Sequence, residues 1–237
     1  MANHKDIVPF IKQAEGGLAR ATTDTASKNV SPCVYDGKKG WHTNKGIQWI
    51  TFESNASRLG YSASCKNFIE MPDDIWTKIY KKSFWDAFNL DNLKSQAVAN
   101  TIVSWAWGSG VGGAYKSLAK FMNQKYGTNY STSYSYSKAK ALINDLTTLT
   151  EKEGDTKIFN ELANWRKEFY IGTGQTANLR GWLSRLDKFQ EYNRMKLKEA
   201  RAVQMNFIKE YWWAIGLGVV GIGGITYALI KYKTTKI

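Results

Sequence analysis

The chain has 237 residues and a formal net charge of +13, with 10 tryptophans, 13 tyrosines and 10 phenylalanines but only three prolines. This length allows one sizeable domain or two small ones plus an appendage, and so aromatic a composition suits a packed, helix-rich core. The positive charge attracts polyanions such as nucleic acid, anionic lipid and bacterial cell wall. No nucleic-acid-binding motif accompanies the charge, so we expect no nucleic-acid partner.

The N-terminal segment predicts an amphipathic helix that ends at an acid. From Asp6 onward, apolar side chains share one helical face at a 3.6-residue spacing; they are Ile7, Phe10, Ile11, Ala14 and Leu18. Glu15 lies at the edge of this face, where partial burial favours the protonated form that a proton donor needs. Gly16 and Gly17 end the helix and let other backbone approach the carboxyl group. Glu15 is therefore a candidate general acid; the alternative is a solvated glutamate beside a glycine cap.

Only two cysteines occur, Cys33 and Cys65, and neither belongs to a CxxC or Cys/His metal-binding pattern. We expect no metal ion and no organic cofactor. The two thiols either form a disulfide that braces the loop after Glu15 or stay free, and the sequence leaves both alternatives open.

The remaining segments before residue 211 predict a mainly α-helical fold. A polar Ser/Tyr loop is expected over residues 126–137, and at most a small β-hairpin in the loop Val30–Thr43. The expected helices cover Thr51–Arg58, Asp73–Phe88, Ser95–Gln124 with a break at Gly108-Ser109-Gly110, Ser137–Leu149, Thr156–Tyr170 and Leu179–Glu210.

Residues 211–230 (YWWAIGLGVVGIGGITYALI) form a run of 20 without a charged side chain, the length that a helix needs to cross about 30 Å of hydrocarbon. Trp212, Trp213 and Tyr227 lie near its ends, where interfacial aromatic residues are common, and three lysines follow in residues 231–237. We predict a single C-terminal transmembrane helix that binds a lipid membrane, and a basic tail. The positive-inside rule favours a cytoplasmic tail, whereas insertion after synthesis would leave the large domain inside, so the topology stays open.

Several segments follow one another in an order that a known family shares. They are Glu15-Gly16-Gly17, Thr43-Asn44-Lys45-Gly46-Ile47, Ile79–Ala87 (IYKKSFWDA), Arg166–Tyr170 (RKEFY) and Arg180–Arg185 (RGWLSR). In this order they resemble glycoside hydrolase family 108, a group of lysozyme-like muramidases, over residues 5 to about 190. The resemblance implies a lysozyme-like catalytic region over residues 1–93 and a helical, peptidoglycan-binding-like region packed on it over residues 94–190. A helical connector (191–210), the transmembrane helix (211–230) and the basic tail (231–237) would complete the chain.

The same resemblance implies cleavage of the β-1,4 bond between N-acetylmuramic acid and N-acetylglucosamine in bacterial peptidoglycan. Glu15 matches the glutamate that protonates the glycosidic oxygen, and Thr43 matches a threonine that lines the cleft opposite the acid and can hold a water. Asp24, nine residues after Glu15, is the expected second catalytic carboxylate; Asp36 or Thr43 alone are the alternatives. The candidate substrate-binding residues are His42, Asn44 and Trp107.

Three further side chains are assigned from their positions. Trp105 and Trp107 are two residues apart and on a helix point about 200° from one another, so at most one can face the cleft. Arg185 is expected to pair with a nearby carboxylate.

The sequence favours a membrane-anchored muramidase of bacteriophage origin, located in the inner membrane of a virion or of the host. A lytic transglycosylase and a non-catalytic wall-binding membrane scaffold are the alternatives.

Overall fold

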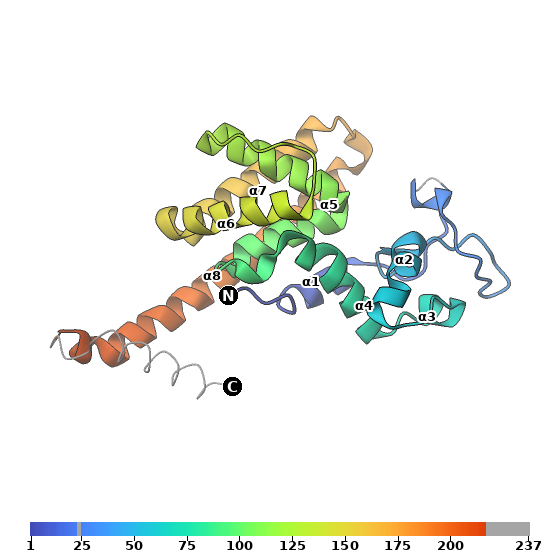
Figure 1. Ribbon diagram of the computed structural model, residues 1–237, viewed down its shortest axis with the longest axis horizontal. Coiled ribbons are helices and arrows are strands. Elements are labelled where there is room, and N and C mark those ends of the chain that lie inside the picture. Colours follow the sequence, from blue (N-terminus) through green and yellow to red (C-terminus); the bar gives the residue numbers. More distant parts are fainter. Residues whose placement is uncertain (23–24, 217–237) are drawn as a thin grey trace. The chain divides into compact units, whose positions relative to one another are not determined.

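The computed structural model describes residues 1–22 and 25–216 and is mainly helical, which confirms the predicted fold class (Figure 1). Residues Met1–Asn193 form one compact unit and Arg194–Ile237 a second. The predicted catalytic and helical regions, 1–93 and 94–190, thus both lie within the first unit.

The elements follow one another along the chain in this order: α1 (Val8–Ala14), the 3₁₀-helix η1 (Thr25–Lys28), β1 (Thr43–Asn44), β2 (Ile47–Gln48), α2 (Trp49–Leu59), α3 (Cys65–Glu70), α4 (Asp73–Tyr80), the π-helix η2 (Lys81–Trp85), the 3₁₀-helices η3 (Asp86–Phe88) and η4 (Leu90–Asn92), α5 (Gln96–Tyr126), α6 (Tyr136–Glu153), α7 (Asp155–Gly172) and α8 (Thr176–Gly216). The predicted helix Asp73–Phe88 therefore consists of α4 continued by η2 and η3.

The β-hairpin lies later in the chain than expected. β1 and β2 pair antiparallel, with Thr43 opposite Gln48 and Asn44 opposite Ile47. The predicted stretch Val30–Thr43 holds only an isolated bridge between Tyr35 and Lys38 apart from Thr43 itself. The prediction was wrong on this point because each strand has only two residues, too few to show the alternation by which a strand is recognised.

α5 forms the centre of the helical core. It packs against α7, which in turn packs against α6, and Figure 1 shows these three helices as one group. Gly110 interrupts α5 with φ 73° and ψ 157°, a backbone conformation that glycine adopts more readily than other residues. This interruption confirms the break expected at Gly108-Ser109-Gly110.

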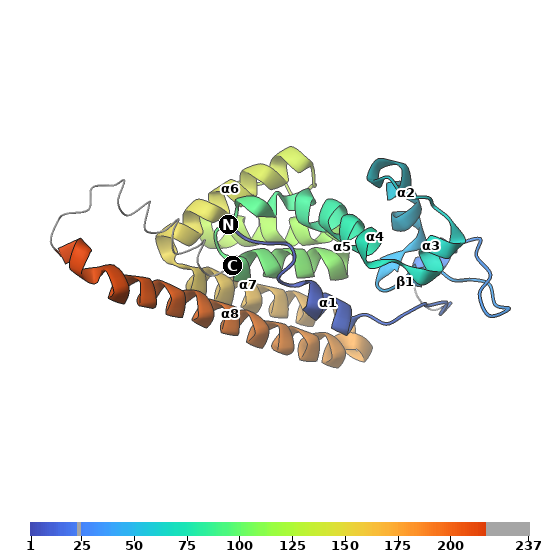
Figure 2. The same ribbon diagram turned by 90° about the horizontal axis from the view of Figure 1, so that it is seen from below.

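The N-terminal helix is fastened to the first part of α8, which runs beside it in Figure 2. The Phe10 ring lies 5.6 Å from the rings of both Phe189 and Tyr192. The Tyr192 hydroxyl donates to the Asp6 carbonyl at 2.7 Å, and the Asn100 amide of α5 donates to the Asp6 carboxylate at 3.0 Å. Helices α5 and α8 thus fix the direction of α1, and with it the position of the acid at its C-terminal end.

Within the described residues, we find no helix that is both long and apolar enough to span a bilayer. Most of the predicted span 211–230 lies outside those residues, because the description ends at Gly216. The transmembrane helix therefore stays a prediction.

Candidate active site

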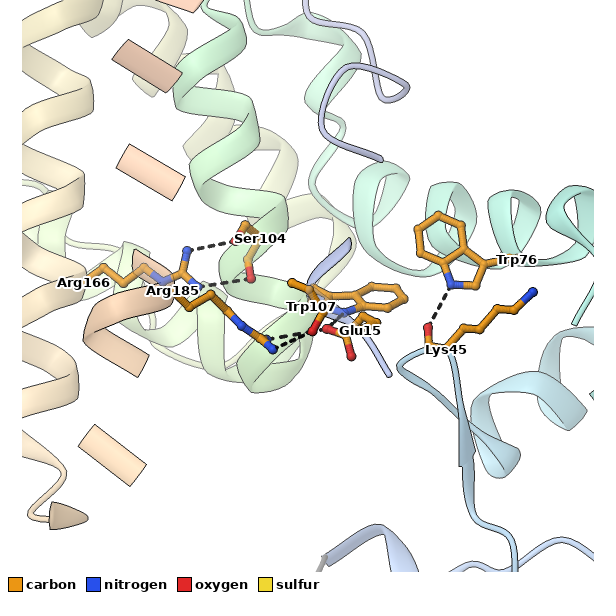
Figure 3. Close-up of polar contacts among 8 residues, drawn as sticks. Glu15, Lys45, Trp76, Ser104, Trp107, Arg166 and Arg185 are labelled. Atoms are coloured by element: carbon orange, nitrogen blue, oxygen red, sulfur yellow. Dashed lines mark hydrogen bonds and ion pairs between the residues drawn. The ribbon is translucent and has the colours of Figure 1, made fainter. Parts of the chain in front are cut away.

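Glu15 caps the C-terminal end of α1 and its carboxylate is held on one side. Its backbone is extended (φ −95°, ψ 137°), and its side chain is 17% exposed. Oε1 accepts a hydrogen bond from Trp107 Nε1 at 2.9 Å and lies 3.5 Å from a guanidinium nitrogen of Arg185. Figure 3 shows the indole and the guanidinium converging on this one carboxyl group. The predicted carboxylate partner of Arg185 is therefore Glu15 itself.

Arg185 also donates to the carbonyl of Ala14 at 3.0 Å. This second bond ties the guanidinium to the last turn of α1, where carbonyl groups lack partners within the helix. Arg185 thereby contacts both the C-terminal end of α1 and the carboxyl group of Glu15, which follows it.

Trp107 lies in a cluster of aromatic rings that orients its N–H group. Its ring centroid is 4.8 Å from that of Phe84, 5.3 Å from Trp76 and 6.0 Å from Tyr80. Trp105 is only 1% exposed and packs against the Phe169 ring at 5.7 Å. The two tryptophans point in different directions, as their spacing predicted, and it is Trp107 that contacts the acid.

The turn of the β-hairpin approaches Glu15 from the other side. Gly46 has φ 79°, and a Cβ atom there would lie 2.8 Å from Glu15 Oε2 and 2.7 Å from Trp107 Cζ2. The preceding Lys45 is fixed on both ends: its carbonyl accepts from Trp76 Nε1 at 2.9 Å, and its ammonium donates to the carbonyl of Met71 at 2.9 Å. Figure 3 shows the bond between Lys45 and Trp76. Only a glycine at position 46 lets the hairpin pack this closely.

Backbone hydrogen bonds join the hairpin to the segment that follows Glu15. Ala19 N–H donates to the Thr43 carbonyl at 2.8 Å, His42 N–H to the Ala19 carbonyl at 3.0 Å, and Lys45 N–H to the Gly17 carbonyl at 3.4 Å. The motifs Glu15-Gly16-Gly17 and Thr43–Ile47, far apart in sequence, thus form one unit around the carboxyl group.

The structure gives His42 and Asn44 a different position from the one expected for substrate-binding residues. His42 is fully buried; its Nε2 lies 3.2 Å from the Ala21 carbonyl and its Nδ1 2.9 Å from the Thr43 hydroxyl. Asn44 is 2% exposed and donates to the Phe68 carbonyl at 2.7 Å. Through these bonds both side chains hold the hairpin in place, and their role in substrate binding stays a prediction.

These contacts show that the Thr43 hydroxyl donates, rather than accepts, its hydrogen bond with His42. Because the Ala21 carbonyl can only accept, Nε2 of His42 carries the imidazole proton. With the proton on Nε2, Nδ1 accepts from Thr43 Oγ1. The oxygen of this half-buried hydroxyl keeps its lone pairs, with which it can accept a hydrogen bond from a water.

The second catalytic carboxylate is not fixed by these contacts. Asp24, the expected residue, lies outside the described residues. The carboxylate of Asp36 is 77% exposed and forms an ion pair with Lys38 at 3.6 Å, in a surface turn with φ 51°. Among the described residues, no group of three or more His, Cys, Asp or Glu side chains could hold a metal ion.

A cavity of about 290 Å³ has Glu15 in its wall. Glu15 and Trp107 form part of its wall together with Arg166 and Arg185, and the aromatic rings that line it are Phe10, Phe169, Tyr170, Trp182 and Phe189. The sequence placed Arg166 only within the RKEFY segment and gave no sign of its role here.

The part of the chain that contains Glu15 matches a known protein family. The family model described as Glycosyl hydrolase 108 matches residues 8–110, a range that contains Glu15, the hairpin and Trp107. Residues 8–110 form a glycoside hydrolase domain.

The fold of the chain is similar to that of a solved structure. The structure of Brucella abortus SagA matches with a TM-score of 0.56 and 21% identity, over 81% of this chain and 94% of that chain. The shared fold therefore extends beyond the glycoside hydrolase domain. No curated protein matches the chain.

Two features complete the glycoside hydrolase domain. A disulfide joins Cys33 to Cys65 at the start of α3, with the Cα atoms 5.3 Å apart, which decides between the two states that the sequence left open. Arg185, however, comes from α8, outside residues 8–110. The acid of the domain is thus supported by a residue of the following helical region.

Proposed function

We propose that the chain is a peptidoglycan hydrolase, an N-acetylmuramidase that cleaves the β-1,4 bond between N-acetylmuramic acid and N-acetylglucosamine. The observation that carries the proposal is the carboxyl group of Glu15, held on Oε1 by Trp107 and Arg185 within a glycoside hydrolase domain. The net charge of +13 favours an anionic substrate such as the bacterial cell wall.

The contacts of Glu15 suggest which oxygen carries the proton. Oε1 accepts from the Trp107 N–H group, so in the acid form the proton belongs on Oε2. Oε2 faces Gly46 at the hairpin turn. A glycosidic oxygen bound there would receive this proton as the bond to the sugar breaks, a step that typically contributes about 10²- to 10⁴-fold to the rate.

The second half of the reaction requires a water and a group that stabilises positive charge on the sugar. We assign the positioning of the water to Thr43, whose hydroxyl oxygen is left as an acceptor by its bond to His42. Asp24 stabilises the positive charge on the sugar and takes up the proton that the attacking water loses. A water that attacks from the face opposite the acid gives inversion at the anomeric carbon.

The test is mass spectrometry of soluble fragments released from purified peptidoglycan by the full chain and by its Glu15→Gln variant. We expect fragments with reducing N-acetylmuramic acid ends from the parent and none from the variant, because glutamine keeps the shape of the side chain but cannot give up a proton to the leaving oxygen. Glu53→Gln, which changes an exposed glutamate of α2, is the matched control and should retain activity.

Other products would decide for the alternatives. Anhydro-N-acetylmuramic acid ends would identify a lytic transglycosylase, and wall binding without fragments would identify a scaffold. In the same assay we expect Asp24→Asn to abolish release and Asp36→Asn to retain it, because Asp36 is exposed and paired with Lys38. The reverse result would move the second catalytic role to Asp36.

We also propose that residues 211–230 anchor the enzyme in a membrane with its large unit facing the wall. The run of 20 uncharged residues supports the span, and the lysines of residues 231–237 support a cytoplasmic tail. The Cys33–Cys65 disulfide supports an oxidising compartment for the large unit. Such an anchor suits a bacteriophage enzyme, either in a virion that contains a membrane or at the host inner membrane during lysis.

A further inference from the structure

Arg166 of α7 is a buried cation in the wall of the cavity next to Glu15. It is 4% exposed. Its guanidinium donates to the Tyr170 hydroxyl at 2.9 Å, and to the hydroxyl and the carbonyl of Ser104 at 3.1 and 3.3 Å. The bonds to Ser104 are drawn in Figure 3. It also lies over the rings of Trp105, Tyr170 and Phe189, 5.4 to 5.8 Å from their centroids.

None of these partners is a carboxylate, so within the described part of the chain the charge of Arg166 is not neutralised. A buried charge without a counter-ion is costly, and burial lowers the pKa of the Arg166 guanidinium. Three of the five N–H donors of a guanidinium are used by Tyr170 and Ser104. A side chain in this state is suited to an anion that brings both the missing charge and the missing acceptors.

The cavity offers space for such an anion. Arg166 and Arg185 both line it, and among the described residues of its wall the one carboxylate, that of Glu15, is already beside Arg185. The charged side chains of the wall therefore leave one positive charge in excess. The volume of about 290 Å³ is at the lower limit of roughly 300–1,000 Å³ for small-molecule sites, so the cavity suits a substituent of the glycan rather than the strand itself.

We propose that this cavity binds a free carboxylate of the peptidoglycan stem peptide, with Arg166 as the recognising residue. The inference rests on the proposed function, because a strand cleaved by Glu15 places its muramic acid next to the cavity. The lactyl group of that sugar carries the stem peptide, whose carboxylates are the anions nearest to the bond. Aromatic walls formed by Phe169 and Trp182 fit the methyl groups of its alanines.

The test is a calorimetric titration of the full chain, kept in a mild detergent, with two probes. One is N-acetylmuramyl-L-alanyl-D-glutamate; the other is the same compound with both glutamate carboxyl groups converted to amides. Neither contains the bond that the enzyme cleaves. We expect the acid to bind about tenfold more tightly than the diamide, the scale of one charge-assisted hydrogen bond, and Arg166→Met to abolish this preference. Arg180→Met, an exposed arginine outside the cavity, should keep it.

The melting temperature separates a binding role from a structural one. Methionine has a similar shape and no charge to bury, so Arg166→Met should melt no lower than the parent if the guanidinium is kept for a ligand. If that variant does not fold, Gly108→Leu replaces it, because Gly108 lines the cavity and a Cβ there meets nothing within 4 Å. Gly108→Leu should likewise abolish the preference by occupying the cavity.

Equal binding of the acid and the diamide by the parent would overturn the inference, as would a preference that survives Arg166→Met or, in its place, Gly108→Leu. Tighter binding of the diamide would overturn it in favour of a site for neutral acetamido groups. These outcomes are independent of the proposed function, which stands or falls with the release of fragments by the parent and not by Glu15→Gln.

Discussion

The carboxyl group of Glu15 is confined by a single glycine of the neighbouring hairpin. At Gly46 a methyl group would overlap both Glu15 Oε2 and the Trp107 ring, so Gly46→Ala should push the acid away from its place. We expect kcat/KM on peptidoglycan to fall about a hundredfold, the scale of a displacement of about 1 Å in an active site. Initial rates of fragment release measure the effect.

Gly37→Ala is the matched control for this substitution. Gly37 also has a positive φ, 65°, but a Cβ there would meet nothing within 4 Å. Both variants should lose about 1 kcal/mol of folding free energy to backbone strain, while only Gly46→Ala should lose activity. Equal activities of the two variants would show that the close approach of the hairpin has no catalytic role.

The N–H group of Trp107 is a second determinant of the acid. Trp107→Phe keeps an aromatic ring but removes the donor to Glu15, so we expect kcat/KM to fall about tenfold, the value of one hydrogen bond to a charged group. Trp105→Phe is the control, because Trp105 Nε1 has no hydrogen-bond partner among the described residues. It should lower the melting temperature, since Trp105 is buried, and leave kcat nearly unchanged. The prediction fails if the two variants lose activity equally.

At this scale the sequence allowed some assignments and not others. An acid at the end of an amphipathic helix, and an arginine in need of a carboxylate, could be predicted from local pattern. That they are each other's partner could not, because Arg185 lies 171 residues after Ala14, whose carbonyl it binds. The burial of His42 could not be predicted, because a histidine next to a motif threonine gives no sign of whether its ring faces solvent or the interior.

Among the elements, the longer helices could be predicted because their apolar residues recur over several turns, whereas the six-residue helix α3 (Cys65–Glu70) was not predicted. The interruption of α5 at Gly110 was predictable for a similar reason, since two glycines in three residues disfavour a continuous helix. The hairpin of residues 43–48 was not, since its strands have only two residues each and it is also held by backbone hydrogen bonds to Ala19 and Gly17. Tertiary contacts of this kind leave no periodic trace in a sequence.

The disulfide is the covalent support of the loop between Glu15 and the hairpin. It links residues 32 positions apart, and in the chain-entropy account closing a loop of this length contributes about 4 kcal/mol. We expect a reductant to lower the urea concentration at which half of the protein is unfolded. Tryptophan fluorescence measures this midpoint. The double variant Cys33→Ser/Cys65→Ser should unfold at that lower midpoint with or without reductant. A parent protein indifferent to the reductant would refute this contribution.

For the whole molecule, the main prediction concerns attachment to membranes. The full chain should float with neutral lipid vesicles in a density gradient at high salt, where attraction of its positive charge to a surface is screened. A chain that ends at residue 210 should remain at the bottom. Val219→Arg/Ile222→Arg is the control in the intact chain, because each arginine costs about 2.5 to 3.5 kcal/mol at the centre of a spanning helix. Flotation of the truncated chain would contradict an anchor in residues 211–230.

The support of Glu15 comes from residues that a ribosome makes much later. Trp107 follows the acid by 92 residues, and Arg185 is made later still, when the first turns of α8 leave the exit tunnel. An interrupted chain that stops within α7 thus carries the glutamate without its guanidinium partner. Glu15 is therefore among the first residues to be synthesised, whereas the last side chain that contacts it, Arg185, is synthesised near the end.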